Sequence, residues 1–98
     1  MIMSSKAFQN WLFHALYSME CENASHGKCV GMVTREEFVN NIQEFEEKNW
    51  EEMTDHEKED FDPPHSKVQI AGAIKALKHR QLIKEYKNSK GEKCLRTL

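Results

Sequence analysis

The chain has 98 residues, of which 39% are hydrophobic and 31% are charged. This length forms one domain with a single small core, which excludes large enzyme scaffolds such as β/α barrels. No stretch approaches the roughly 20 apolar residues that a membrane helix needs, and no signal-peptide pattern opens the chain. Three cysteines, an odd number, favour reduced thiols over a disulfide framework. We therefore expect a soluble domain in the cytoplasm, or in the nucleus if the source is eukaryotic or viral, and no membrane partner.

The charges are divided unequally along the chain. Residues 1–63 carry five Lys or Arg against fourteen Asp or Glu, whereas residues 64–98 carry nine Lys or Arg against two Glu. This asymmetry predicts a basic surface for a polyanion or an acidic protein, and an acidic surface that repels polyanions. The alternative is that the two halves attract each other and only improve solubility.

The first predicted element is a helix over residues 4–20. Six apolar side chains recur at the spacing of one helical face. They are Phe8, Trp11, Leu12, Ala15, Leu16 and Met19. Phe13 and Tyr17 lie beside this stripe as a second apolar edge, which either packs in the core or contacts a partner. Residues 21–29 lose the periodicity and contain Asn, Ser and Gly, so they predict a loop.

A short strand is expected at residues 30–33, followed directly by a helix over 35–53. Thr34-Arg35-Glu36-Glu37 matches a capping box, in which the threonine hydroxyl accepts from a backbone amide and Glu37 accepts from the cap amide. The helix should therefore begin at Arg35. Its apolar side chains are Phe38, Val39, Ile42 and Phe45, and the pattern runs on through Trp50 and Met53.

A second capping box, Thr54-Asp55-His56-Glu57, predicts either an extra short helix at 55–61 or a kinked continuation. Pro63-Pro64 then predicts an extended connector. Ser66 is a good N-cap for a helix over 67–80, whose apolar side should contain Val68, Ile70, Ala71, Ile74 and Leu77. Two β-prone runs within 82–98 surround a turn whose Gly91 favours positive φ, which predicts a β-hairpin.

Three segments in this order resemble the winged helix-turn-helix fold: VGMVTREEFVNNI, SKVQIAGAIKALKHRQ and LIKEYKNSKGEKCLRTL. The resemblance covers most of the chain and implies one small α+β domain, with three to four helices and the hairpin as a C-terminal wing. Family members join their second and third helices by a short turn, whereas here an acidic segment of about twenty residues, 48–65, intervenes. Either 35–47 is the first helix of the motif, with an insertion behind it, or 55–61 takes that role.

The resemblance also implies DNA binding, as in a small transcriptional regulator, with helix 67–80 in the major groove and the wing on the backbone or minor groove. The outward face of that helix is expected to contain Gln69, Gly72, Lys75, Ala76 and His79. The full set of expected DNA contacts is Lys67, Gln69, Lys75, Lys78, His79, Arg80, Lys84, Lys87, Lys90, Lys93 and Arg96. The outward face has no arginine, although Arg to guanine is the commonest specific contact. A homodimer is the expected mode, with Phe13 and Tyr17 as its candidate interface.

Acidic residues 44–62 support a different hypothesis, a protein-binding winged helix that acts as an adaptor or inhibitor. Its acidic side chains would engage a basic protein surface or mimic a polyanion. The candidate partner-binding residues are Phe13, Tyr17, Glu51, Glu52, Asp55 and Glu59. A solvated helical face is the simpler interpretation of the same acidic residues.

Cys21, His26 and Cys29 are a weak metal-site candidate, because thiolates and imidazole are zinc ligands and His14 or Cys94 could complete the set. The chain has no CxxC pair, so reduced thiols are the simpler interpretation. It also lacks a phosphate-binding Gly-rich loop, a Gly-x-Ser-x-Gly motif and a His-Glu-x-x-His motif. We expect neither an enzyme nor a cofactor.

Overall fold

The computed structural model describes residues 5–25 and 31–98. Its helices are α1 (Ser5–Ser25), α2 (Arg35–Glu52), α3 (Asp55–Lys58) and α4 (Lys67–His79), and its strands are β1 (Val33–Thr34), β2 (Ile83–Lys87) and β3 (Lys93–Thr97). The expected α+β class is therefore confirmed, with four helices and a three-stranded antiparallel sheet in the described part of the chain. None of the described helices is both long and apolar enough to cross a membrane.

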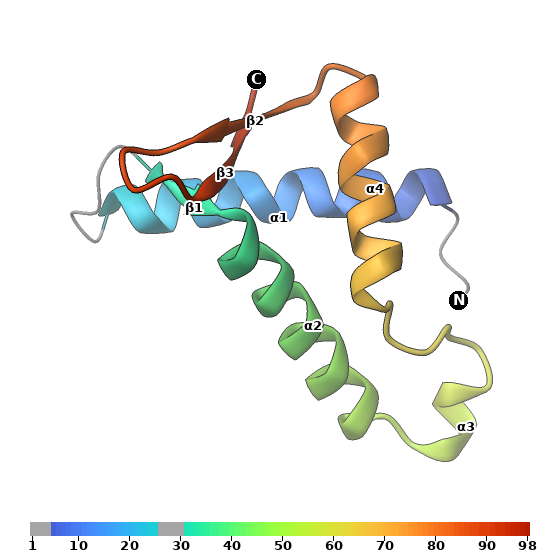
Figure 1. Cartoon of the computed structure of the whole chain (residues 1–98). Helices are drawn as coiled ribbons and strands as arrows, with labels where there is room; N and C mark the ends of the chain where they lie inside the picture. The colour runs from blue at the N-terminus through green and yellow to red at the C-terminus, as the bar shows by residue number, and fades with distance from the viewer. Residues whose placement is uncertain (1–4, 26–30) are drawn as a thin grey trace.

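Helix α1 extends across the whole molecule, with the sheet against one end and α4 crossing it near the other (Figure 1). Helix α2 leads away from the sheet toward α3, and the following connector returns the chain to α4. Buried side chains from α1, α2, α4 and all three strands meet in one cluster. Its members are Phe8, Leu12, Leu16, Val33, Phe38, Ile42, Ile70, Ala73, Ile74, Leu77, Ile83 and Leu95. Burial of this apolar surface is the main stabilising contribution to the fold.

Three helices begin where the sequence predicts, because each has a side-chain cap. The Thr34 hydroxyl accepts a hydrogen bond from the Glu37 amide at the start of α2. Thr54 and Ser66 form complete capping boxes with Glu57 and Gln69 at the starts of α3 and α4. The short helix predicted at 55–61 is helical only over Asp55–Lys58.

The sheet has the order β1-β3-β2, so the strand before α2 pairs with the last strand of the chain. In the hairpin, Ile83 is opposite Thr97 at one end and Lys87 is opposite Lys93 at the other. The turn between them is organised by Asn88, whose side-chain oxygen accepts hydrogen bonds from the amides of Lys90 and Glu92. Gly91 has φ of +80°, as the turn prediction requires.

The loop predicted at 21–29 is wrong for its first half, because α1 continues to Ser25. Asn23 is buried, and its side-chain amide donates a 2.7 Å hydrogen bond to the carbonyl oxygen of Met32, which fixes this turn of α1 to the segment before β1. The strand predicted at 30–33 is wrong for residues 31 and 32, because β1 begins at Val33 and Gly31 has φ of +63°, outside the extended region. The predicted residues 4 and 30 lie outside the described part of the chain.

Two predictions of apolar burial are also wrong. Val68 is 80% exposed, because it lies two residues, about 200° of helical rotation, from the buried Ile70. Phe45 is 52% exposed, because the second half of α2 extends beyond the core; its ring lies 5.7 Å from that of Trp11.

Candidate nucleic-acid interface

The β2–β3 hairpin carries five basic residues, and all five are exposed. They are Lys84, Lys87, Lys90, Lys93 and Arg96. Among the described residues, Arg35 and Lys78 form ion pairs with Glu85, and the imidazoles of His56 and His65 contact Glu59 and Glu46. None of these contacts involves the five hairpin cations. The hairpin therefore presents five cations that form no ion pair within the described part of the chain, beside one exposed carboxylate, Glu92.

The register of the hairpin places like charges directly opposite each other. Lys84 pairs with Arg96, and Lys87 pairs with Lys93. Opposed side chains on neighbouring strands have Cβ atoms about 4.5–5.5 Å apart, and like charges at this separation are destabilising. A bound polyanion would relieve this repulsion, because each phosphate offers a counter-charge to both members of a pair.

Three of the predicted α4 residues are engaged within the domain. Gln69 accepts a 2.8 Å hydrogen bond from the Ser66 amide through its side-chain oxygen. The ammonium group of Lys78 lies 3.5 Å from a carboxylate oxygen of Glu85. The Arg80 guanidinium donates to the side-chain oxygens of Gln9 and Asn10, at 3.1 and 3.3 Å.

The remaining predicted α4 residues are exposed cations or small residues. Lys67, Lys75 and His79 are exposed, and so is Gly72, whereas Ala76 is half-buried rather than outward-facing as expected. Lys75 and His79 share the outward side of α4, opposite the buried stripe that faces α1. The structure therefore separates the hairpin cations from a less strongly charged outward face of α4.

Sequence reasoning missed Glu85, which joins three elements. Its carboxylate accepts a 2.6 Å hydrogen bond from Arg35, the first residue of α2, and lies near Lys78 of α4. Burial raises the pKa of Glu85, but the hydrogen bond from Arg35 and the positive charges of Lys78 and Arg35 outweigh this effect and hold the pKa below its usual value. The sequence feature that could have identified Glu85 is a single carboxylate within a strand that otherwise carries basic residues. This network joins the hairpin to α2 and α4.

A cavity of about 460 Å³ lies between the first turns of α2, the N-terminal half of α4 and the start of β3. Its lining includes the cations Arg35, Lys67 and Lys93, and also the carboxylates Glu36 and Glu92. The mixed charge makes this hollow a poorer site for a polyanion than the hairpin.

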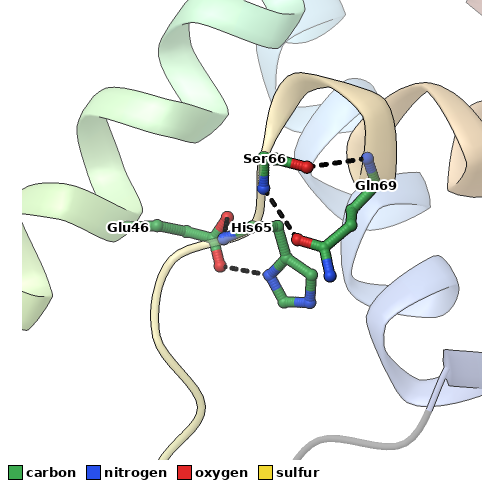
Figure 2. Close-up of polar contacts among 4 residues, drawn as sticks. All are labelled: Glu46, His65, Ser66 and Gln69. Atoms are coloured by element: carbon green, nitrogen blue, oxygen red, sulfur yellow. Dashed lines mark hydrogen bonds and ion pairs between the residues drawn. The ribbon is translucent and has the colours of Figure 1, made fainter.

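The start of α4 is held against α2 and α1 by His65, a second residue that the sequence did not identify (Figure 2). Its Nδ1 lies 2.7 Å from a carboxylate oxygen of Glu46, and its backbone amide donates to the other oxygen of that carboxylate. Its ring stacks on Phe8 with 3.7 Å between centroids. These contacts fix the connector after Pro63-Pro64, so the acidic segment does not leave α4 loosely attached.

The acidic candidates occupy the end of the molecule opposite the hairpin. Glu51 and Glu52 end α2, and Asp55 and Glu59 belong to α3 and its C-cap; all four are exposed. Figure 1 shows α3 far from β2 and β3. The structure therefore separates the two surfaces that the charge asymmetry predicted.

The second apolar edge of α1 is divided between the core and solvent. Phe13 is partly buried and packs against the core cluster, whereas Tyr17 is 56% exposed. Only Tyr17 therefore remains freely available for a contact with a partner.

The metal-site candidates are only partly described. Cys21 is an exposed free thiol and Cys94 is a buried one, while His26 and Cys29 lie outside the described residues. Burial, and then the charge of Glu92, raise the pKa of the Cys94 thiol. Within residues 5–25 and 31–98, no three metal-ligating side chains come together.

Comparisons of the chain with protein-family models, with curated proteins and with solved structures found no match.

Proposed function

We propose that the chain is a winged-helix domain that binds double-stranded DNA mainly through its β2–β3 hairpin. The hairpin is anchored as a wing should be, because β1 pairs with β3 and the Arg35–Glu85 hydrogen bond joins β2 to the start of α2. A wing fixed in this way holds its cations in place, with the pair Lys84–Arg96 on one face of the hairpin and the pair Lys87–Lys93 on the other. This lowers the entropic cost of binding a rigid duplex.

The observation that carries the proposal is the pairing of basic side chains across the hairpin. Lys84 faces Arg96 and Lys87 faces Lys93, and none of these four has an ion-pair partner among the described residues. A duplex carries one negative charge per about 1.7 Å of its axis, so several phosphates can lie within reach of one hairpin. If all five hairpin cations contact phosphates, the logarithm of the binding constant should fall against the logarithm of salt with a slope of about −4.5.

The position of the acidic residues is compatible with this contact. Helix α3 and the last turn of α2 lie at the opposite end of the molecule from the hairpin (Figure 1). A duplex that contacts the hairpin can therefore extend away from the carboxylates, whose repulsion is screened beyond about 10 Å at moderate salt.

The test is fluorescence anisotropy of a labelled mixed-sequence duplex over a series of salt concentrations. The Lys87→Glu/Lys90→Glu variant should lose binding. A matched variant, Lys6→Glu/Lys48→Glu, changes the net charge equally at two exposed positions outside the hairpin and should retain binding with the same salt slope. Absence of binding even at low salt refutes DNA binding. Equal losses in both variants refute the hairpin as the contact surface.

A second candidate function is protein binding through the acidic end, which is the alternative that the sequence raised. The observation that favours it is the 42% exposure of Phe61 among acidic side chains, because an exposed aromatic ring beside charges is typical of interface residues. The matched test mixes the chain with a basic protein such as a histone and compares Glu51→Lys/Glu52→Lys with wild type. If the complex is lost in this variant but not in Lys87→Glu/Lys90→Glu, the acidic end is the protein-binding surface. The reverse result would exclude the acidic end as that surface.

A further inference from the structure

The side chains of α4 that could read bases are largely committed to contacts within the domain. A glutamine recognises adenine through a bidentate contact that uses both its oxygen and its amide nitrogen. The side-chain oxygen of Gln69 already accepts a hydrogen bond from the backbone N–H of Ser66. In the other half of the capping box, the backbone N–H of Gln69 donates to the Ser66 hydroxyl. Using that oxygen on a base would therefore remove half of the capping box that starts α4.

The basic residues at the other end of α4 are held in a similar way. Arg80 donates to the side-chain oxygens of Gln9 and Asn10 and is thereby directed along α1. Lys78 is directed toward Glu85 of the hairpin. Neither side chain extends from the outward side of α4, where a helix in the major groove contacts base edges.

The outward side of α4 itself has few groups that distinguish bases. It consists of Val68, Gly72, Lys75 and His79, and the space around Gly72 is empty. Lysine and histidine can neutralise phosphates, and no arginine, which makes the commonest base-specific contact, lies between Lys67 and His79. By contrast, the five exposed cations of the hairpin are free to contact the backbone of any duplex.

We infer that the domain binds duplex DNA through the phosphate backbone, without preference for base sequence, and that α4 supports the hairpin instead of reading bases. This inference rests on the proposed DNA binding. Phosphate contacts fix position and orientation but carry no sequence information, and these are the contacts that the free cations can make. A regulator built on this domain would take its operator selectivity from another subunit or another protein.

The experiment equilibrates the full chain with a library of duplexes randomised over their central base pairs and sequences the bound and unbound fractions. Two variants are compared with wild type: Lys87→Ala/Lys93→Ala in the hairpin, and Lys75→Ala/His79→Ala on α4. We expect no base to be enriched at any position of the bound duplexes. The dissociation constants of individual duplexes should agree within about threefold, because a single bidentate base contact already changes affinity by about 5- to 150-fold between the right and the wrong base. The hairpin variant should lower the salt slope by about 2, and the α4 variant should weaken all duplexes by one common factor.

The possible failures are distinguishable. Enrichment of particular bases, removed by Lys75→Ala/His79→Ala or by Val68→Ala, overturns the inference while DNA binding itself stands. Absence of binding at low salt overturns the proposed function, and the inference with it. An unchanged salt slope in the hairpin variant overturns the assignment of phosphate contacts to the hairpin.

Discussion

The pairing of Lys87 with Lys93 makes the stability and the proposed function of the hairpin respond in opposite directions to one substitution. Lys87→Glu places opposite charges at directly opposed positions of β2 and β3. The substitution removes a repulsion between two cations and adds an attraction between opposite charges. Since a cross-strand charge pair contributes roughly 0.2–1 kcal/mol, the free energy of unfolding should rise by about 0.5–1 kcal/mol. For a domain of this size the Tm should rise by about 2–8 °C. DNA binding should weaken in the same variant.

A charge-swap cycle separates this pairing from unrelated effects of each substitution. Lys87→Glu and Lys93→Glu should each stabilise the fold, whereas the double variant restores a like-charge pair, now of two carboxylates, and should lose both gains. Lys87→Gln removes only the repulsion and should fall between wild type and Lys87→Glu. The assay is urea denaturation followed by tryptophan fluorescence, with the midpoint and slope compared between variants.

Salt provides an internal control for the same cycle. The Debye length falls from about 10 Å at 0.1 M to about 3 Å at 1 M salt, so the differences between variants should shrink as salt is added. The reasoning is refuted if neither single variant is more stable than wild type at low salt, or if the double variant equals the sum of the two single variants.

Four other substitutions test three separate parts of the structure. Gly31→Ala should destabilise the fold by more than Gly91→Ala in urea denaturation. Both glycines have positive φ, where a side chain costs roughly 1–2 kcal/mol. Only at Gly31 would the added Cβ also lie 2.8 Å from a backbone oxygen of α1. Equal losses would exclude the close approach of Gly31 to α1. Glu85→Gln should lower the free energy of unfolding at neutral pH, and the difference from wild type should shrink as the pH falls below 4.5. The reason is that the pKa of Glu85 is lower in the folded than in the unfolded chain, so its carboxylate stabilises the fold above the unfolded pKa and loses this effect as the pH falls through the folded pKa. A difference in denaturation midpoint that does not change with pH would contradict this. Tyr17→Glu should convert any homodimer to monomer in light scattering without changing the unfolding midpoint, and a dimer that persists would exclude this edge as the interface.

The starts of α2, α3 and α4 could be predicted from sequence because their causes lie within four residues. Thr34, Thr54 and Ser66 each satisfy a backbone amide of the following turn, so neither the core nor the rest of the chain is needed to place them. The end of α1 could not be predicted in this way. In this last part of α1, Asn23 donates to the carbonyl oxygen of Met32, nine residues away, and the loop-like composition of 21–25 does not indicate that hydrogen bond.

Burial was predicted less well than helix position, for a geometric reason. Periodicity places Phe45 on the same face as Phe38 and Ile42, but whether a face is covered depends on how far the neighbouring helix extends. Hydrophobicity alone favours Val68 as part of the apolar stripe of α4, but two residues of separation from Ile70 turn it to the opposite side of the helix.

The candidate interface shows the same division between local and long-range information. Counting lysines in the last 35 residues predicts a basic hairpin, but only the strand register shows that its cations oppose each other in pairs. Register also places Glu85 where Arg35 and Lys78 can reach it, so the one carboxylate within β2 is used to fasten the hairpin and does not neutralise the hairpin cations. The cations of this hairpin therefore oppose its own pairing, and a bound polyanion is the kind of partner that would offset that cost.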